Sequence, residues 1–164
     1  MFGNFDIDPA RILLQYVTLL FALCFHEAAH AWMAWRCGDS TARFLGRMTL
    51  NPQSHIDPIG TVVMPLLMLV TGIPFLFGWA KPVPFNPINL NDRRLDPVKI
   101  ALAGPLSNVL LAVIFAVLLK LALTLGQFGL PEAALTIIFQ VAMSLIVINL
   151  VLFLFNLIPV PPLD

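Results

Sequence analysis

The sequence has few charged residues, and this scarcity indicates its class. Only 11% of its 164 residues are Asp, Glu, Lys or Arg, whereas soluble domains carry roughly 25%. The nine basic and nine acidic residues cancel, so we expect no nucleic-acid partner. Two cysteines, Cys24 and Cys37, are too few for a disulfide framework and are expected to be free thiols. Hydrophobic residues make up 59% of the chain, so we expect its surroundings to be a lipid bilayer.

Four long apolar stretches account for most of this hydrophobic content, at residues 11–34, 59–79, 99–125 and 133–158. A helix needs about 20 apolar residues to cross the hydrocarbon core, and each stretch is long enough. No basic leader or small-residue cleavage site accompanies the first stretch, so we expect it to stay in the protein as a span. The pattern predicts an all-α polytopic membrane protein that forms a single domain over residues 1–164.

The second stretch differs from the others because glycine and proline interrupt it. Pro65, Gly72, Pro74 and Gly78 all fall within residues 59–79. Broken backbone at membrane depth is tolerated only where protein or water satisfies its polar groups, so a re-entrant hydrophobic hairpin competes with a fourth full crossing. We favour the hairpin, which leaves three core transmembrane helices at 11–34, 99–125 and 133–158.

The segments between these stretches are polar and rich in turn residues. Apolar and polar residues alternate over residues 41–50, which predicts short membrane-associated strands. Prolines at positions 82, 84, 87 and 97 favour an extended, turn-rich loop between the second and third stretches.

The first apolar stretch contains the sequence HEAAH at residues 26–30. On a helix, His26 and His30 project from one face, one turn apart, where two imidazoles can share a metal ion. Glu27 lies beside them; in H-E-x-x-H sites the glutamate takes a proton from a metal-bound water whose pKa zinc lowers to about 7. The motif predicts zinc-dependent peptide hydrolysis and requires a third protein ligand from elsewhere in the chain.

A five-residue pattern of this kind also occurs by chance, and a buried histidine is more often a hydrogen-bonded core residue than a ligand. Within an apolar span, however, ionisable residues are costly and are generally functional. Three such residues in five positions therefore favour a metal site over packing. Carboxylates beside the later stretches are scarce: Glu132 borders a loop, and Asp164 is the only carboxylate after the last stretch.

Three motifs follow one another along the chain, HEAAH at 26–30, AGPLSN at 103–108 and NLIPVPPLD at 156–164. Their order resembles the site-2 protease family, peptidase family M50, whose members are intramembrane zinc metalloproteases. The segments NPQSHIDP and GWAKPVPFNP are similar to a minimal subgroup without PDZ or CBS domains. The resemblance implies that His26, His30 and Asp164 bind one zinc ion and that Glu27 is the general base. Asn156 matches a family asparagine implied to hold the substrate backbone or the developing oxyanion.

Two further polar residues are candidates for the same site. Asn108 could hydrogen-bond near the metal or the substrate, or it could tie helices together as amides in membrane bundles do; we favour the structural role. His55, in the segment SHIDP, could stabilise the substrate, or it could be a loop histidine beside the helix-capping Asp57.

The positions of the implied ligands predict the topology. His26 and His30 lie toward the C-terminal end of their span, and Asp164 lies just beyond the end of the last span. A full crossing at 59–79 would separate them by much of a bilayer, about 30 Å, whereas a hairpin brings them together. The hairpin also puts seven of the nine basic residues on one side, at positions 36, 43, 47, 81, 93, 94 and 99. By the positive-inside rule we expect the N-terminus outside and the active site toward the cytoplasm. The membrane we expect is a bacterial inner membrane.

The resemblance implies that the substrate is a transmembrane protein, single-pass or otherwise, cleaved within or near a membrane helix; it gives no oligomeric state. Two other functions stay open: a membrane transporter that uses the histidine pair as a metal transit site, and a non-catalytic scaffold that binds membrane helices. The transporter predicts metal flux and tolerance of Glu27→Gln. Because the family motif continues with glycine after the aspartate, we expect the native chain to continue beyond Asp164.

Overall fold

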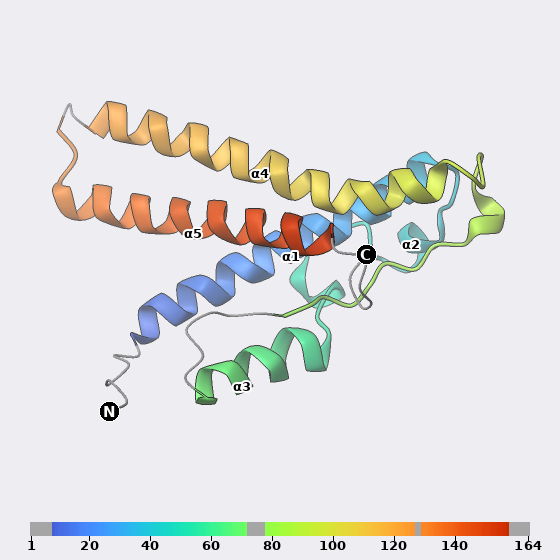
Figure 1. Cartoon of the computed structure of the whole chain (residues 1–164), viewed down its shortest axis with the longest axis horizontal. Coiled ribbons are helices and arrows are strands. Elements are labelled where there is room, and N and C mark those ends of the chain that lie inside the picture. The colour runs from blue at the N-terminus through green and yellow to red at the C-terminus, as the bar shows by residue number, and fades with distance from the viewer. Residues whose placement is uncertain (1–7, 72–77, 127–128, 158–164) are drawn as a thin grey trace.

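The computed structural model describes residues 8–71, 78–126 and 129–157, and three long helices dominate it (Figure 1). α1 spans Pro9–Arg36, α4 spans Asp96–Gly126 and α5 spans Glu132–Asn156. Among the described residues, these three helices are long and apolar enough to cross a membrane. They confirm the predicted all-α architecture and its three core spans, and each end falls within three residues of the predicted boundary.

α1 begins at a cap that its own sequence supplies. The side chain of Asp8 accepts a hydrogen bond from the backbone N–H of Ala10 at 3.0 Å. Pro9 occupies the first turn, where its missing N–H has no cost. Buried positions then recur every three or four residues along the helix, at 19, 22, 23, 26, 30 and 34 among others. The histidines therefore continue the stripe that packs against the rest of the bundle.

The chain turns sharply after α1, and the side chain of Asp39 connects the loop after α1 to the loop before α4. Gly38 has a φ of 104°, and a side chain there would collide with the carbonyl of Asn89. Asp39 is fully buried and accepts hydrogen bonds from the backbones of Thr41 and Asn86. Burial opposes its ionisation, but these bonds and others from Thr41 and Asn89 side chains lower the pKa of Asp39 below its usual value. The carboxylate therefore fixes the loop after α1 against the loop before α4.

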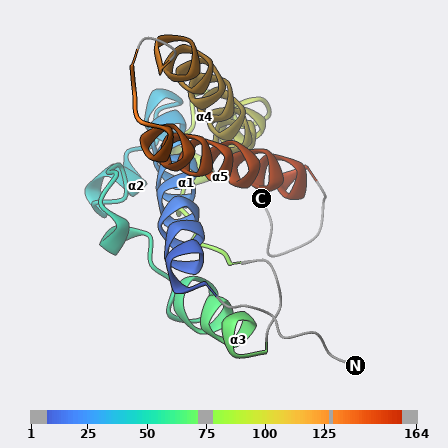
Figure 2. The same ribbon diagram turned by 90° about the vertical axis from the view of Figure 1, so that its left-hand side faces the viewer.

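α4 and α5 run antiparallel, and α1 packs against both (Figures 1 and 2). Thr18 on α1 and Ser144 on α5 share a hydrogen bond between their hydroxyls at 2.9 Å. The neighbouring apolar core consists of Leu19, Ala22, Leu23, Ala80 and Leu152. α1 and α5 run in the same general direction (Figure 1). The chain therefore leaves both helices toward the same side, as the predicted ligand positions require.

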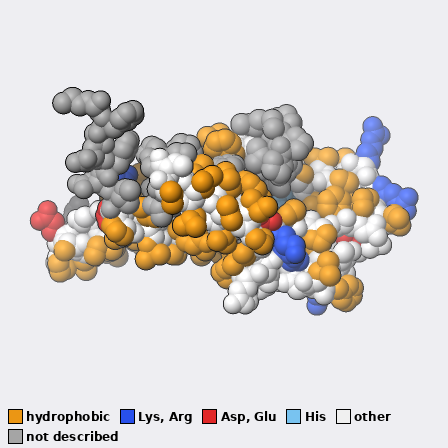
Figure 3. All heavy atoms as spheres, turned by 90° about the horizontal axis from the view of Figure 1, so that it is seen from below, with side chains coloured by type: hydrophobic (Ala, Val, Ile, Leu, Met, Phe, Trp, Pro, Cys, Tyr) orange, Lys and Arg blue, Asp and Glu red, His pale blue; other side chains and the backbone are white. Residues whose placement is uncertain are grey.

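The outward faces of the long helices are apolar. Leu110, Val113 and Val117 on α4 and Leu150 and Leu154 on α5 are exposed, which suits helices that contact lipid. Hydrophobic side chains cover much of the visible face in Figure 3, and several Lys and Arg side chains lie in the half of the molecule where α1 finishes and α4 begins.

The described part of the apolar stretch at 59–79 is too short to cross a membrane. A π-helix, Pro58–Val63, continues into α3, Met64–Thr71, and together they measure at most about 21 Å at 1.5 Å per residue. The hydrocarbon core is about 30 Å thick. In addition, the N–H of Trp79 donates to the carbonyl of Gly60 at 3.3 Å, so the two ends of the stretch are in contact. Among the described residues, this stretch therefore contains no helix long enough for a fourth crossing.

The predicted hairpin at 59–79 is not seen among the described residues of the stretch, which form a helix up to Thr71 and a loop at 78–79. Pro65 does not break it. Proline lacks the N–H that an α-helix directs to the carbonyl four residues earlier, here that of Thr61, and the hydroxyl of Tyr16 donates to this carbonyl at 3.2 Å. Residues 72–77, which contain the remaining Gly-Pro interruption, lie outside the described residues.

The predicted strands at 41–50 are wrong. Residues Thr41–Phe44 form a short helix, α2, and the described part of the chain contains no strand. The carboxylate of Asp39 accepts from both the backbone and the hydroxyl of Thr41, which favours a helical start over an extended chain. The loop at 81–95 lacks regular helix or strand, as its prolines predict, apart from a 3₁₀ turn at Pro87–Asn89 and a turn at 93–95. Another 3₁₀ turn occupies Pro52–Ser54.

Candidate metal centre

The two histidines lie on the buried face of α1, as their spacing predicts. His26 is 2% exposed and His30 is 6% exposed, and their Nε2 atoms are 3.0 Å apart. Glu27 is also buried. Two nitrogen ligands of one tetrahedral zinc ion, each about 2.0–2.1 Å from it, would lie roughly 3.3 Å apart. The pair therefore fits a shared zinc ion with a shift of only a few tenths of an ångström.

The other nitrogen of each ring is held by α4. Nδ1 of His30 donates to the backbone carbonyl of Ile100 at 2.7 Å. Nδ1 of His26 lies 3.0 Å from Nδ2 of Asn108. Metal-binding histidines typically donate the Nδ1 proton to a carbonyl or carboxylate, so that Nε2 points at the metal. His30 has this arrangement, whereas Nδ1 of His26 accepts from the amide of Asn108.

Gly104 on α4 backs the two Nε2 atoms. A Cβ at this position would lie 2.6 Å from Nε2 of His26 and closer still to Nε2 of His30. Such distances are too short for real side chains, so α4 approaches α1 closely only because residue 104 has no side chain. The space between the imidazoles and α4 is thus set by this glycine.

The third predicted ligand, Asp164, lies outside the described residues. In the part of the chain that is described, no three His, Cys, Asp or Glu side chains gather where they could hold one metal ion. Asn156 is the last residue of α5; it is half-buried, and its amide donates to the carbonyl of Leu152 at 2.9 Å. The structure therefore brings together His26, Glu27, His30 and Asn108.

His55 is buried within its own loop. It is 2% exposed, and its Nε2 donates to the carbonyl of Thr49 at 2.8 Å. Burial lowers the pKa of His55, and the charge of Arg47 adds to this, although the bond to Thr49 acts in the opposite sense. His55 is therefore neutral near pH 7, and its observed contact is that of a loop-ordering residue.

Two partners of the histidines could not be found by motif alone. The carbonyl of Ile100 holds His30, but a backbone group leaves no signal in the sequence. Gly104 lies directly against both imidazole rings. Its place in the motif AGPLSN indicates only that two helices approach closely, not which side chains it contacts. Asn108 was identified as a polar residue at membrane depth, and its contact with His26 gives it a specific neighbour.

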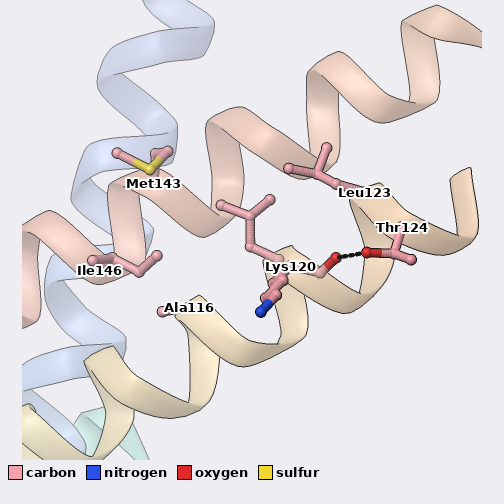
Figure 4. A pocket seen from close by; sticks show the side chains of 7 residues that line it. Ala116, Lys120, Leu123, Thr124, Met143 and Ile146 are labelled. Atoms are coloured by element: carbon pink, nitrogen blue, oxygen red, sulfur yellow. Dashed lines mark hydrogen bonds between the residues drawn. The ribbon is translucent and has the colours of Figure 1, made fainter. Parts of the chain in front are cut away.

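A pocket between α4 and α5 is separate from this centre. Lys120, Leu123, Met143 and Ile146 line it together with Ala116, Leu119 and Thr124 (Figure 4). Lys120 follows Gly104 by sixteen residues, which is about 24 Å along a helix. The pocket therefore takes no part in the chemistry of the histidine pair.

Comparison with known proteins agrees with this geometry. Residues 15–134 match the model of peptidase family M50. The chain is 46% identical over 148 residues to a Bacillus subtilis (strain 168) protein described as "Putative zinc metalloprotease YwhC", covering 90% of this chain and 64% of that protein.

Proteins named Rip2, with the same description, are similar over 145 residues, which is 88% of this chain and 51% of theirs. That of Mycolicibacterium smegmatis is 30% identical. That of Mycobacterium tuberculosis is 32% identical over the same shares of the two chains. The chain thus spans between about half and two thirds of the length of these relatives, and no solved structure matches it. Because the family model covers most of the chain, including the histidine pair and its partners on α4, the protein belongs to peptidase family M50.

Proposed function

We propose that this protein is an intramembrane zinc metalloprotease that hydrolyses a peptide bond within or near a membrane helix of another protein. The observation that carries the proposal is the buried imidazole pair, whose Nε2 atoms lie 3.0 Å apart beside Glu27. These groups lie in a bundle of helices apolar enough to cross a membrane, where ionisable residues are costly without a function. Membership of family M50 and relatives described as zinc metalloproteases support the same activity.

His26 and His30 would hold one zinc ion through Nε2, with Asp164 as the third ligand. The direction of α5 supports this set, because the chain leaves α5 toward the same side as the C-terminal half of α1. Zinc bound there would lower the pKa of a coordinated water to about 7 and polarise the scissile carbonyl.

Glu27 would act as the general base. Its carboxylate takes a proton from the attacking water as the water oxygen bonds to the carbonyl carbon. It then gives this proton to the amide nitrogen as the C–N bond breaks, so the leaving segment departs as a neutral amine. Burial of Glu27 keeps bulk water from competing for the proton.

Asn156 would assist from the end of α5. Its amide could donate to the substrate backbone or to the developing oxyanion after giving up its bond to Leu152. A role for His55 in substrate binding would require its ring to give up the hydrogen bond to the carbonyl of Thr49. We therefore favour Asn156 over His55 as the residue that binds the substrate.

The substrate we propose is a transmembrane helix that unwinds locally to expose its backbone. The loop at 81–90, which forms no strand in the structure, would be the edge to which an unwound segment docks. We further propose that residues 59–79 do not complete a crossing, so that α1 and α5 run in the same direction through the membrane; the contact between Trp79 and Gly60 supports this. The basic residues at 36, 43, 47, 81, 93, 94 and 99 would then face the cytoplasm, and the N-terminus would lie outside. The metal centre would open toward the cytoplasmic side of a bacterial inner membrane.

Metal removal in proteoliposomes tests the proposed function. The protein would be reconstituted with a panel of single-pass membrane proteins that carry a tag on each side of the membrane. We expect cleavage of at least one reporter, its loss after treatment with a zinc chelator, and its return when zinc is added back. Cleavage that persists without metal would contradict the proposal, as would zinc uptake into the vesicles without any cleavage, the result that a transporter gives.

A further inference from the structure

Asn108 contacts the candidate metal centre from α4. Its side chain is fully buried, and its Nδ2 lies 3.0 Å from Nδ1 of His26. It follows Gly104 by one helical turn, so both lie on the face of α4 that meets α1. α4 therefore contacts both edges of the His26 ring, with Gly104 at Nε2 and Asn108 at Nδ1. An amide that only tied two helices together would not need to meet this particular atom.

The contacts of His30 indicate the tautomer that presents Nε2 to a metal ion, the one with its proton on Nδ1. Its Nδ1 faces the carbonyl of Ile100, which can only accept, so the neutral ring carries its proton on Nδ1. The lone pair of His30 is therefore on Nε2, the atom nearest to His26. For both Nε2 atoms to bind one metal ion, His26 must also carry its proton on Nδ1, and that proton needs an acceptor.

The carboxamide of Asn108 can serve either tautomer of His26. In the structure its Nδ2 donates to Nδ1 of His26, which directs the His26 proton on Nε2 toward Nε2 of His30. A half turn of the carboxamide presents Oδ1 to the same atom instead. Oδ1 is buried and has no hydrogen-bond partner among the described residues, so the turn breaks no bond made by that oxygen. It also gives a buried acceptor the partner that such groups normally have.

We propose that Asn108 is a positioning residue for His26. When zinc binds, its Oδ1 accepts the Nδ1 proton of His26 and fixes the ring in the tautomer that presents a lone pair to the metal. The inference rests on the proposed function, because it assigns the histidine pair to zinc. Loss of such an outer partner typically weakens metal binding by about 10–100-fold.

The zinc affinity of Asn108 variants tests this role. Asn108→Leu keeps the size of the side chain but offers no acceptor, whereas Asn108→Asp keeps an acceptor for the Nδ1 proton. Full-length protein in detergent would be titrated with zinc against a competing chelator. We expect a Kd about 10–100-fold higher for Asn108→Leu and within about threefold of wild type for Asn108→Asp. Cobalt(II) in place of zinc would show an altered visible absorption spectrum in Asn108→Leu alone.

Asn149→Leu is the matched control. Asn149 is the other fully buried asparagine described, and its amide donates to the carbonyl of Leu145 in its own helix. We expect its loss to leave the zinc Kd unchanged. An unchanged Kd in Asn108→Leu would overturn the inference while the protease proposal stands, and so would an equal loss in Asn149→Leu. Wild-type protein that binds no zinc would overturn both.

A measurement on wild-type protein keeps the inference testable if Asn108→Leu does not fold. With zinc bound and ¹⁵N-labelled histidine, we expect the Nδ1 proton of His26 to be visible by nuclear magnetic resonance and protected from exchange with water. A zinc-loaded His26 with its proton on Nε2, or with a rapidly exchanging Nδ1 proton, would overturn it.

Discussion

Glu27→Gln is expected to reduce kcat for peptide-bond cleavage by about 10²–10⁴-fold, the usual contribution of a general base. Glutamine has the size and shape of glutamate, so it fits the buried position beside His26 without opening a cavity. It cannot accept a proton from the attacking water. Because residue 27 is not among the proposed ligands, zinc content and KM are expected to stay near the wild-type values.

The reporter panel in proteoliposomes measures this effect, and Glu132→Gln provides the control. Glu132 is exposed in the first turn of α5, where the same change removes a carboxylate that takes no part in the chemistry. We expect its kcat to equal that of the wild type. A Glu27→Gln protein that cleaves within about threefold of wild type would remove Glu27 from the mechanism and favour a transport or binding function for the histidine pair.

Gly104→Ala is expected to weaken zinc binding without replacing a ligand. The new Cβ would lie 2.6 Å from Nε2 of His26, and closer to His30. The rings cannot swing aside freely, because the bonds to Ile100 and Asn108 hold them on the other edge. Overpacking of this kind costs typically about 1–3 kcal/mol, so we expect zinc affinity to fall by roughly 5–150-fold and cleavage to fall with it.

Gly126→Ala is the matched change on the same helix. The Cβ of this variant would meet only the end of the Leu135 side chain on α5, which can rotate away. We expect some loss of thermal stability and an unchanged zinc Kd. Equal zinc affinity in Gly104→Ala and the wild type would mean that α4 does not pack on the histidines as described.

The long helices and the histidine pair could be predicted from the sequence because each has a strong local signal. A run of more than 20 apolar residues in lipid favours a helix, because a helix satisfies its backbone hydrogen bonds within the segment. The ends of the three predicted spans therefore agree with the helix ends to within three residues. His26 and His30 share a face wherever the chain is helical, whatever surrounds it. Their burial follows from the same periodicity.

The structure of the loops could not be predicted in this way, because it depends on contacts between residues that are distant in sequence. The alternation at 41–50 predicts strands, but the buried carboxylate of Asp39 holds Thr41 at the start of a helix instead. Pro65 predicts a break, but the hydroxyl of Tyr16, far away in sequence, satisfies the carbonyl that this proline leaves. Neither contact can be inferred before the fold is known.

The partners of the histidines were only partly predictable for the same reason. Asn108 has a side-chain signal, an amide in an apolar run, yet its meeting with His26 depends on how α4 packs against α1. The carbonyl of Ile100 has no signal at all. Asp164, implied by the family motif, stays a prediction because it lies outside the described residues.

Zinc content tests the central claim most directly. Detergent-purified wild-type protein, His26→Ala and Asp164→Ala would be analysed by inductively coupled plasma mass spectrometry. We predict one zinc ion per chain in the wild type and its loss in both variants, which would join the histidines of α1 and the aspartate after α5 in one site. Zinc that remains in His26→Ala would contradict the account, because the buried imidazole pair would then not be the metal centre.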